Sequence, residues 1–349
     1  MKLIIQIPCL NEEQTLPATL ADLPRELDGF DEVQWLVIDD GSTDRTVEVA
    51  KAHGVDHIVR LTTNKGLAYA FQAGLDACLK LGADVIVNTD ADNQYNGADI
   101  GKLTAPVVAG NADMVVGDRE VMGIEHFSPL KKSLQRLGSW VVRRASETTV
   151  PDTTSGFRSY NREAAMQLIV VSKFTYTLET IIQAGKQFIA VDHVPIRTNP
   201  KTRESRLFTS MWSYVRRNGL SIFRIYTRYE PLRVFMTAAA IVFLAAFIIW
   251  ARFLYFYIVE DDGAGHVQSL ILGAVLFNAG MLLAALGILG DLLSANSTML
   301  QRVFERVRRI ELQLDVPPSH YEPGADSEHP PTTGARAGQR TEEHEALKA

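Results

Sequence analysis

Two aspartates one residue apart, Asp90 and Asp92, carry the strongest chemical signal in this 349-residue sequence. They follow residues 83–89, an apolar and β-branched run that predicts a buried strand. Ligands of open α/β sheets bind beyond the carboxyl ends of the strands, which is where this pair lies. Aspartates at i and i+2 can share one hard divalent cation, and Gln94 can add a carbonyl oxygen. The stretch therefore predicts a metal site beside a diphosphate, with an ordinary polar loop as the alternative.

Two earlier predicted strands end in loops of the same chemical character. One runs into Asn11 and Glu12, and the next into Asp39 and Asp40. Because the carboxyl ends of parallel strands meet at one edge of a sheet, these loops and the Asp90 loop should converge. Carboxylates gathered at one edge repel each other unless cationic or hydrogen-donating groups lie among them. A ribose, a base and a metal ion would meet that need.

The elements that must position these loops alternate along the first 118 residues. Gly41 permits a tight turn after the second strand, and Ser42, Thr43 and Asp44 are candidate N-caps of the helix that follows. This alternation predicts an α/β fold with a doubly wound, mainly parallel sheet. The predicted strands are residues 3–7, 34–38, 57–61, 83–89 and 114–117, and the predicted helices begin near residues 11, 42, 64 and 99.

Basic residues follow the predicted sheet. Arginine suits bidentate phosphate binding, and a phosphate-bearing acceptor needs such a cluster whereas a neutral sugar does not. The alternative is that part of this set forms a solvated or lipid-facing helix face. The set comprises Arg119, Lys131, Lys132, Arg136, Arg158, Arg203 and Arg206, with hydroxyls from Ser139 or Ser155.

The chain changes character after residue 200. Residues 207–229 place aromatic and aliphatic side chains among arginines, which suits interfacial helices. Residues 234–259 and 267–293 are each long enough to cross a bilayer. Arginines precede the first span and follow the second, while the loop between them has no Lys or Arg. The positive-inside rule then predicts a multi-pass protein of the plasma membrane with the catalytic domain and both termini in the cytoplasm.

These features divide the chain into five segments. They are residues 1–200 as the catalytic domain, 201–232 as interfacial amphipathic helices, 233–294 as a two-helix transmembrane domain, 295–315 as a basic amphipathic helix and 316–349 as a disordered tail. Two spans per chain leave lateral surface for self-association into a homo-oligomer. The formal net charge of −6 argues against a nucleic-acid partner, and two isolated cysteines, Cys9 and Cys78, indicate a reducing compartment.

Four motifs in this order resemble the inverting, GT-A-fold glycosyltransferases of family 2, over roughly residues 1–230. They are residues 7–12, 39–44, 64–66 and 90–94. The resemblance implies a GT-A fold (Rossmann-like, with a mainly parallel sheet) and a UDP- or GDP-sugar donor. It implies a nucleotide site of Pro8, Glu12, Asp39, Asp40 and Lys65, and Mg²⁺ or Mn²⁺ bound by Asp90, Asp92 and Gln94.

Residues 152–162, which begin Asp-Thr-Thr-Ser-Gly-Phe-Arg, resemble an element of the polyprenyl-phosphate glycosyltransferases, a group that includes the dolichyl-phosphate mannose synthases. The basic loop near Arg206 departs from the group, since Arg203 and Arg206 replace its usual Gly and Lys. The resemblance implies a polyprenyl phosphate acceptor. Together with the basic cluster described above, it gives two sets of candidate site residues. The catalytic set is Asp152, Arg158 and Arg119, and the acceptor-phosphate set is Arg119, Arg136, Ser139, Ser155 and Arg206.

The role of Asp152 stays open between a general base and a group that positions Arg158 or the sugar. A phosphate monoester is already ionised near neutral pH, so its attacking oxygen has no proton to lose. The sequence favours sugar transfer with inversion to a polyprenyl phosphate at the cytoplasmic membrane face. The alternatives are a glycolipid-forming transferase with a non-phosphorylated acceptor, and a membrane scaffold that binds nucleotide-sugar without turnover.

Overall fold

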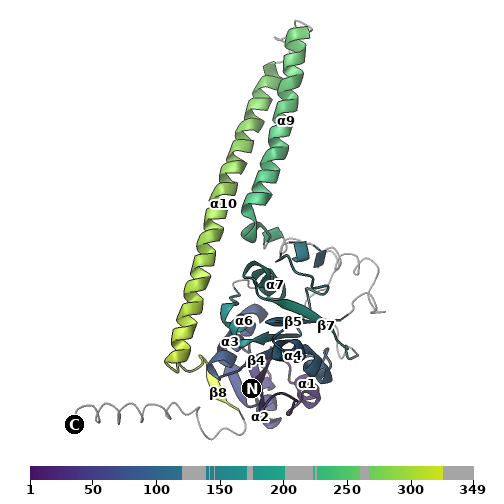
Figure 1. Ribbon diagram of the computed structural model, residues 1–349, viewed down its shortest axis with the longest axis vertical. Coiled ribbons are helices and arrows are strands. Elements are labelled where there is room, and N and C mark those ends of the chain that lie inside the picture. Colours follow the sequence, from purple (N-terminus) through teal and green to yellow (C-terminus); the bar gives the residue numbers. More distant parts are fainter. Residues whose placement is uncertain are drawn as a thin grey trace, which may run out of the picture. The chain divides into compact units, whose positions relative to one another are not determined.

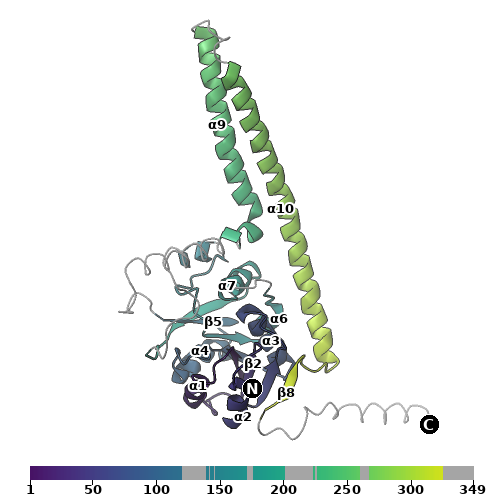
Figure 2. The ribbon, with the colours of Figure 1, turned by 180° about the vertical axis from the view of Figure 1, so that it is seen from behind.

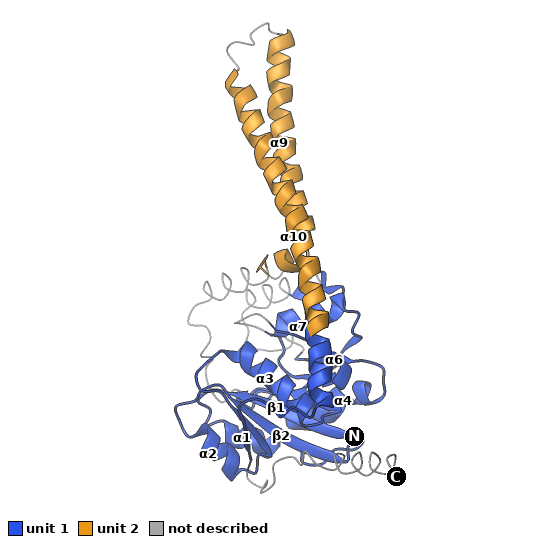
Figure 3. Ribbon diagram, turned by 90° about the vertical axis from the view of Figure 1, so that its left-hand side faces the viewer, with its two compact units in different colours: residues 1–213, 304–349 blue, residues 214–303 orange. Residues whose placement is uncertain are grey.

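The computed structural model describes residues 1–119, 139–140, 142–144, 146–170, 176–200, 223–224, 226–259 and 267–324. The chain divides into two compact units (Figure 3). The first comprises residues 1–213 and 304–349, and the second comprises residues 214–303. Arg136, Lys131, Lys132, Arg203 and Arg206 lie outside the described residues, as does most of the predicted interfacial segment.

The first unit is built on one mixed sheet in the order β7-β5-β6-β4-β1-β2-β3-β8 (Figure 1). Strand β1 pairs in parallel with β2 and β4, and β2 pairs in parallel with β3. The strands are β1 (Lys2–Cys9), β2 (Glu32–Asp39), β3 (His57–Arg60), β4 (Val85–Asn88), β5 (Met114–Asp118), β6 (Arg158–Asn161), β7 (Val191–Pro195) and β8 (Tyr321–Pro323). The five strands predicted from the sequence are confirmed as β1 to β5, and the sheet is mainly parallel around them.

Helices cover both faces of the sheet because β1 and β2 are buried on both sides. Ile5 and Ile7 belong to a core with Leu16 and Leu20 of α1 and Leu103 of α4. Between them, Gln6 points to the other face, where the backbone of α3 approaches it at Gly74. The helices are α1 (Leu16–Asp22), α2 (Thr46–Ala52), α3 (Leu67–Lys80), the 3₁₀ turn η1 (Gly97–Asp99), α4 (Ile100–Val108), α6 (Arg162–Gln167) and α7 (Thr177–Lys186).

The strands that the sequence did not predict lie at the two ends of the sheet and in its middle. Strand β6 is antiparallel to both β4 and β5, and β7 is parallel to β5. Strand β8 is antiparallel to β3 at the far edge (Figure 2). Residues 321–323 thus form a strand inside the segment expected to be disordered, because the edge of β3 offers unpaired backbone groups and His57 bonds the Tyr321 hydroxyl at 2.9 Å.

The last ten residues of the helix α10 (Val267–Gln313) belong to the first unit and contact α3 and α6 there. Arg308 donates to the backbone oxygens of Met166 and Leu168, at 3.0 and 2.9 Å, where α6 ends. Lys80 of α3 forms a 3.0 Å ion pair with Glu311. The two Arg308 bonds satisfy carbonyl oxygens at the end of α6, where the helix itself offers no donor.

The second unit is a pair of long antiparallel helices, α9 (Pro231–Val259) and the larger part of α10. Both are long and apolar enough to cross a membrane. Gly273, Gly280 and Gly287, seven residues apart, are the buried positions of α10. A Cβ on Gly280 would lie 2.7 Å from the Phe243 ring, so the missing side chains let the helices pack closely. Because α10 is one continuous helix, the expected boundary between residues 294 and 295 is not a break.

Candidate active site

The register of the strands brings the informative loops to one edge of the sheet. Cys9 at the end of β1 lies beside Asp39 at the end of β2. Asn88 at the end of β4 lies beside Arg158, the first residue of the antiparallel strand β6. The loop that enters β6 therefore starts at the same edge where the parallel strands end. This placement confirms the expected convergence of the acidic loops and adds residues 152–157 to them.

Asp39 presents a buried acceptor at this edge. Its side chain is 1% exposed, and its Oδ1 accepts the backbone N–H of Ser42 at 2.9 Å. Its Oδ2 is buried and accepts no hydrogen bond from the described residues; Nε of Arg60 lies 3.7 Å away. A buried carboxylate oxygen normally has a donor. A hydroxyl or N–H of a bound nucleotide would supply it.

Asp40 organises the neighbouring loop. Its two carboxylate oxygens accept the backbone N–H groups of Lys65 and Gly66, at 2.7 and 2.9 Å. Burial raises the pKa of the Asp40 carboxyl, while these two bonds oppose the shift. Gly41 has φ +75°, and a Cβ there would meet the backbone of residues 63 and 64 at 2.7 Å. The Asp40 carboxylate thereby fixes the start of α3 next to the end of β2.

The remaining residues expected at the nucleotide lie beside Asp39. Pro8 is buried and lies next to Ile38 in the sheet register. Glu12 is 8% exposed, and its backbone N–H donates to Thr46 Oγ1 at 2.9 Å. The Lys65 ammonium lies 4.5 Å from the centre of the Tyr69 ring, a cation–π contact. Their roles at a nucleotide stay predictions.

The loop after β4 carries the two aspartates. Burial and the negative charge of Asp92 raise the pKa of Asp90 to about 7. The backbone N–H of Gln94 donates to Asp92 Oδ1 at 3.1 Å, which closes a tight turn. A Cβ on Gly156 would lie 3.1 Å from both carboxylate oxygens of Asp90, so only glycine leaves this approach to Asp90 open. A cation bound beside the two carboxylates would offset the repulsion that helps to raise the pKa of Asp90.

These donors fit a divalent cation that shares its coordination with a ligand. Asp90 and Asp92 offer hard carboxylate oxygens, and Gln94 an amide oxygen, which suits Mg²⁺ or Mn²⁺. Across the described parts of the chain there is no cluster of three or more His, Cys, Asp or Glu arranged to hold a metal by themselves. A two-carboxylate site agrees with a metal whose remaining ligands are diphosphate oxygens.

Arg119, just after β5, is paired with Asp152. Its Nε donates to Oδ2 at 2.7 Å and its Nη2 to Oδ1 at 3.1 Å, while Nη2 also donates to Thr154 Oγ1 at 2.8 Å. Asp152 is 2% exposed. Burial alone would raise the pKa of Asp152, but the guanidinium and the Thr154 bonds hold it below its usual value. The positive charge of Arg119 also acts on the pKa of Asp90, lowering it, so the two groups share one electrostatic site.

Arg158 occupies a different environment from the one expected of a phosphate ligand. Its side chain is 0% exposed. The guanidinium donates to the backbone oxygens of Ser155, Thr177 and Thr153, at 2.7, 2.8 and 3.0 Å, and to Thr180 Oγ1 at 2.7 Å. These bonds tie the loop before β6 to the start of α7. Arg158 thus holds the loop that carries Asp152, and does so from inside the protein.

The other residues expected at the acceptor are buried. Ser139 and Ser155 are 3% and 0% exposed. Ser139 accepts a hydrogen bond from Thr153 Oγ1 at 3.2 Å, and Ser155 accepts the backbone N–H of Phe157 at 3.4 Å. Both brace residues 152–157 in this structure. Arg136 and Arg206, expected at the same phosphate, lie outside the described residues.

The structure adds two aromatic residues that the sequence did not single out. The Tyr95 hydroxyl accepts the Gly156 N–H at 2.9 Å and bonds the Asp90 carboxylate. Its ring stacks on Phe157, with centres 5.0 Å apart. Tyr176 stacks on Phe71 at 4.0 Å, and its hydroxyl accepts the Asn88 amide at 2.9 Å. Tyr95 directly follows Gln94 in the sequence, and this position next to the acidic motif is the sequence feature that could have identified it as a site residue.

Asn199, after β7, is hydrogen-bonded to the loop after β4 that carries Asp90, Asp92 and Gln94. Its backbone N–H donates to the backbone oxygen of Gln94 at 2.9 Å, and its side-chain amide donates to Asn93 Oδ1 at 3.3 Å. Two residues earlier, Arg197 forms an ion pair with Asp99, with 2.9 Å between Nη2 and Oδ1. Asn199 therefore lies against the loop that carries Asp92 and Gln94.

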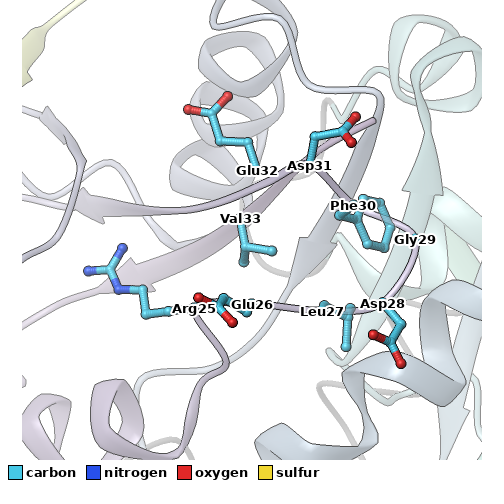
Figure 4. A pocket seen from close by; sticks show the side chains of 9 residues that line it. All are labelled: Arg25, Glu26, Leu27, Asp28, Gly29, Phe30, Asp31, Glu32 and Val33. Carbon is cyan, nitrogen blue, oxygen red and sulfur yellow. The ribbon is translucent and has the colours of Figure 1, made fainter.

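A hollow of about 700 Å³ lies elsewhere, at the start of β2 (Figure 4). It is lined by residues 25–33, with four carboxylates, and none of the expected site residues takes part. The sheet edge described above is at the other end of β2, where Asp39 lies. The hollow is therefore not part of the candidate site.

Comparison with known proteins identifies the family of this chain. The sequence profile of glycosyl transferase family 2 matches residues 4–169. An uncharacterised glycosyltransferase of Mycobacterium tuberculosis is 32% identical over 199 residues, 57% of this chain and 85% of that one. An undecaprenyl-phosphate mannosyltransferase of Micrococcus luteus is 32% identical over 169 residues, 47% of this chain and 68% of that one.

Among solved structures, glucosyl-3-phosphoglycerate synthase of Mycobacterium tuberculosis has the same fold. Its complex with phosphoglyceric acid gives a TM-score of 0.52 at 18% identity, covering 65% of this chain and 79% of that one. Its complex with Mn²⁺, UDP-glucose and phosphoglyceric acid gives a TM-score of 0.50 at 20% identity, covering 63% and 79%. Sequence and fold together show that this chain belongs to glycosyl transferase family 2, as a GT-A-fold member of its polyprenyl-phosphate glycosyltransferase group.

Proposed function

We propose that this glycosyltransferase moves a sugar from a nucleoside diphosphate sugar to a polyprenyl phosphate, with inversion at the anomeric carbon. The acceptor phosphate oxygen forms a bond to that carbon, and the bond from the carbon to the diphosphate breaks. The relatives support the class of acceptor, since one of them is named an undecaprenyl-phosphate mannosyltransferase.

The state of Asp152 is the observation that carries this proposal. A hydroxyl acceptor must lose its proton, which calls for a general base with a pKa near the working pH. Both oxygens of Asp152 are engaged by Arg119, and its pKa is held low. Such a carboxylate is a weak base. An acceptor phosphate carries its charge already and needs a cation, so this pair favours a phosphate over the neutral acceptor of a glycolipid-forming enzyme.

The donor half of the site is the edge formed by β1, β2 and β4. Asp39 Oδ2, buried without a hydrogen bond from the described residues, suits a ribose hydroxyl or base N–H of a UDP- or GDP-sugar. Asp90, Asp92 and Gln94 would hold Mg²⁺ or Mn²⁺ at the diphosphate. When bound, the metal would stabilise the charge that grows on the leaving diphosphate. The pairing with Asp152 aims the Arg119 guanidinium, which adds a fixed positive charge near Asp90.

The long helices α9 and α10 would hold the enzyme at the membrane where its lipid acceptor lies. Their apolar lengths support two spans. The arginines before the first span and after the second support a cytoplasmic catalytic domain and cytoplasmic termini. We also propose that copies of the chain self-associate through the spans.

A donor and product assay tests the proposed function. Purified full-length protein in lipid vesicles would receive UDP- and GDP-sugars one at a time, with Mn²⁺ and a polyprenyl phosphate. We expect one donor to give a lipid-linked sugar phosphate, detected by mass spectrometry, whose anomeric configuration by NMR is opposite to that of the donor. Retention of configuration would refute inversion. Absence of product with every donor would refute the proposed function and favour a non-catalytic scaffold.

A further inference from the structure

Asn278 lies in the middle of the apolar part of α10. The nearest polar or charged residues along the sequence are Ser269 and Asp291. At 1.5 Å per residue these lie about 13 and 20 Å away along the helix axis, so the amide sits near the centre of a span that needs about 30 Å. This inference rests on the proposed membrane crossing of α10.

The Asn278 side chain points away from the partner helix α9. The buried seam of α10 is formed by Gly273, Gly280 and Gly287. At 100° per residue, Gly280 is 200° further around the helix than Asn278, which puts the two on nearly opposite sides. Asn278 is accordingly exposed. Within the described part of the chain, no hydrogen bond to its amide is present.

An exposed amide at this depth is unfavourable in a bilayer. Lipid tails offer neither donors nor acceptors, so an unpaired amide in hydrocarbon is unfavourable. Mid-span asparagines therefore usually bond across to another helix. The helix α9 cannot supply that partner, since it packs on the other side of α10.

The face around Asn278 suits close approach by a second helix. Alanines flank the amide four residues before it and seven residues after it, at Ala274 and Ala285, and both are exposed. Small residues let two helix backbones come together. The remaining exposed positions between residues 267 and 293 that lie within about 40° of Asn278 on the helical wheel are Val267, Ile271, Leu282, Leu289 and Leu292.

We infer that this face of α10 binds the same face of a second copy of the chain, with the two Asn278 amides hydrogen-bonded to each other at mid-membrane. All copies insert with the same orientation, so a two-fold axis along the membrane normal places residue 278 at one depth in both. An amide carries both donor and acceptor, so a single asparagine per chain is self-complementary in this symmetry. A lone polar residue in a helix seam also fixes the register of the pair.

Two asparagines on the same helix stripe provide a matched comparison. Asn296 lies 18 residues after Asn278, five full turns along the same face, and is also exposed. It follows Asp291, beyond the apolar part, where water and headgroups can satisfy an amide. Asn278→Leu should therefore weaken association, whereas Asn296→Leu should not, and Asn278→Gln should keep it.

The experiment measures the dimer dissociation constant of the full-length protein in lipid vesicles by single-molecule photobleaching over a range of protein-to-lipid ratios. We expect Asn278→Leu to raise that constant roughly 3- to 20-fold, with wild type, Asn278→Gln and Asn296→Leu alike. A wild type that is monomeric at every ratio would overturn the inference and leave lipid or another protein on this face. Equal dissociation constants for Asn278→Leu and wild type would overturn it as well.

Sugar transfer is measured on the same vesicles, so the two claims fail separately. Dimerisation that depends on Asn278 in a protein without transferase activity would contradict only the proposed function. Transferase activity in a protein whose association ignores Asn278 would contradict only this interface.

Discussion

The guanidinium of Arg119 donates two hydrogen bonds to the carboxylate of Asp152, at 2.7 and 3.1 Å. The pair joins the end of β5 to the loop that enters β6, at the edge of the sheet where Asp90 lies. Because Asp152 is buried, its low pKa depends on this partner. We therefore propose that Asp152 positions Arg119 and that the positive charge of Arg119 acts on the phosphate groups of the substrates.

Asp152→Asn should reduce turnover about 10- to 100-fold without changing the shape of the pH–rate profile. The amide keeps one acceptor for Arg119 but loses the charge that orients it. Steady-state rates from pH 6 to 9 measure the effect. A wild-type rate that falls on the acid side of the profile, with no such fall in the variant, would instead identify Asp152 as the general base.

Arg119→Lys should lower turnover to a similar extent. A lysine ammonium cannot make the two parallel bonds to Asp152 and the third to Thr154. Circular dichroism and turnover of the same preparation separate folding from activity. Wild-type turnover in a folded Arg119→Lys protein would show that the three guanidinium bonds to Asp152 and Thr154 are not required for activity.

Arg158→Ala should destabilise the first unit by at least about 3 kcal/mol, since it leaves several buried carbonyl oxygens without a donor. Arg45→Ala is the matched control, because the Arg45 side chain is 81% exposed and its ion pair with Glu13 is solvent-screened. Chemical denaturation of both variants gives the comparison. Equal free energies of unfolding would show that the buried network around Arg158 is not structural.

Gly156→Ala should raise the Mn²⁺ concentration required for half-maximal activity about tenfold or more. The new Cβ would lie 2.8 Å from the Tyr176 hydroxyl and 3.1 Å from the Asp90 oxygens, so the Asp90 carboxylate must move. Gly101→Ala is the control. Gly101 lies in helix α4, where alanine is favoured, and the new Cβ would come no closer than 3.5 Å to the Leu27 side chain. An unchanged Mn²⁺ requirement in Gly156→Ala would remove Asp90 from the metal site.

The attachment of β8 should weaken as the pH falls. Burial and the nearby Lys2 lower the pKa of His57 from 6.5 to about 4, so below pH 6.5 the unfolded chain binds a proton that the folded protein resists. The free energy of unfolding then falls with decreasing pH, by about 2 kcal/mol between pH 6.5 and 5. Thermal unfolding of wild type and His57→Gln isolates this contribution. A difference between them that does not change with pH would contradict it.

Local patterns were enough to predict the elements that build the donor half of the site. Apolar β-branched runs, followed by acidic loops, predicted β1, β2 and β4 and the convergence of Asp39 and Asp90 at one edge. These signals are local, because each strand and its loop are contiguous in sequence.

The rest depends on contacts that the sequence does not display. Strand β6 is short and enters the sheet antiparallel to β4, so nothing in its sequence alone predicted that Arg158 would be buried. Residues 321–323 form a strand only because the edge of β3 and His57 are there to receive them. Arg158 and Arg119 are both motif arginines, yet one supports the loop from inside and the other lies at the site; only burial and partners distinguish them.

A comparison of lipid acceptors, with Asp92→Ala as the control, separates transfer to a phosphate from transfer to a hydroxyl. Nucleoside diphosphate release would be measured with the active donor and Mn²⁺, in the presence of either a polyprenyl phosphate or the matching polyprenol. We predict release by wild type with the phosphate alone, and none by folded Asp92→Ala with either lipid. Equal release with the polyprenol, or wild-type release by Asp92→Ala, would contradict the account.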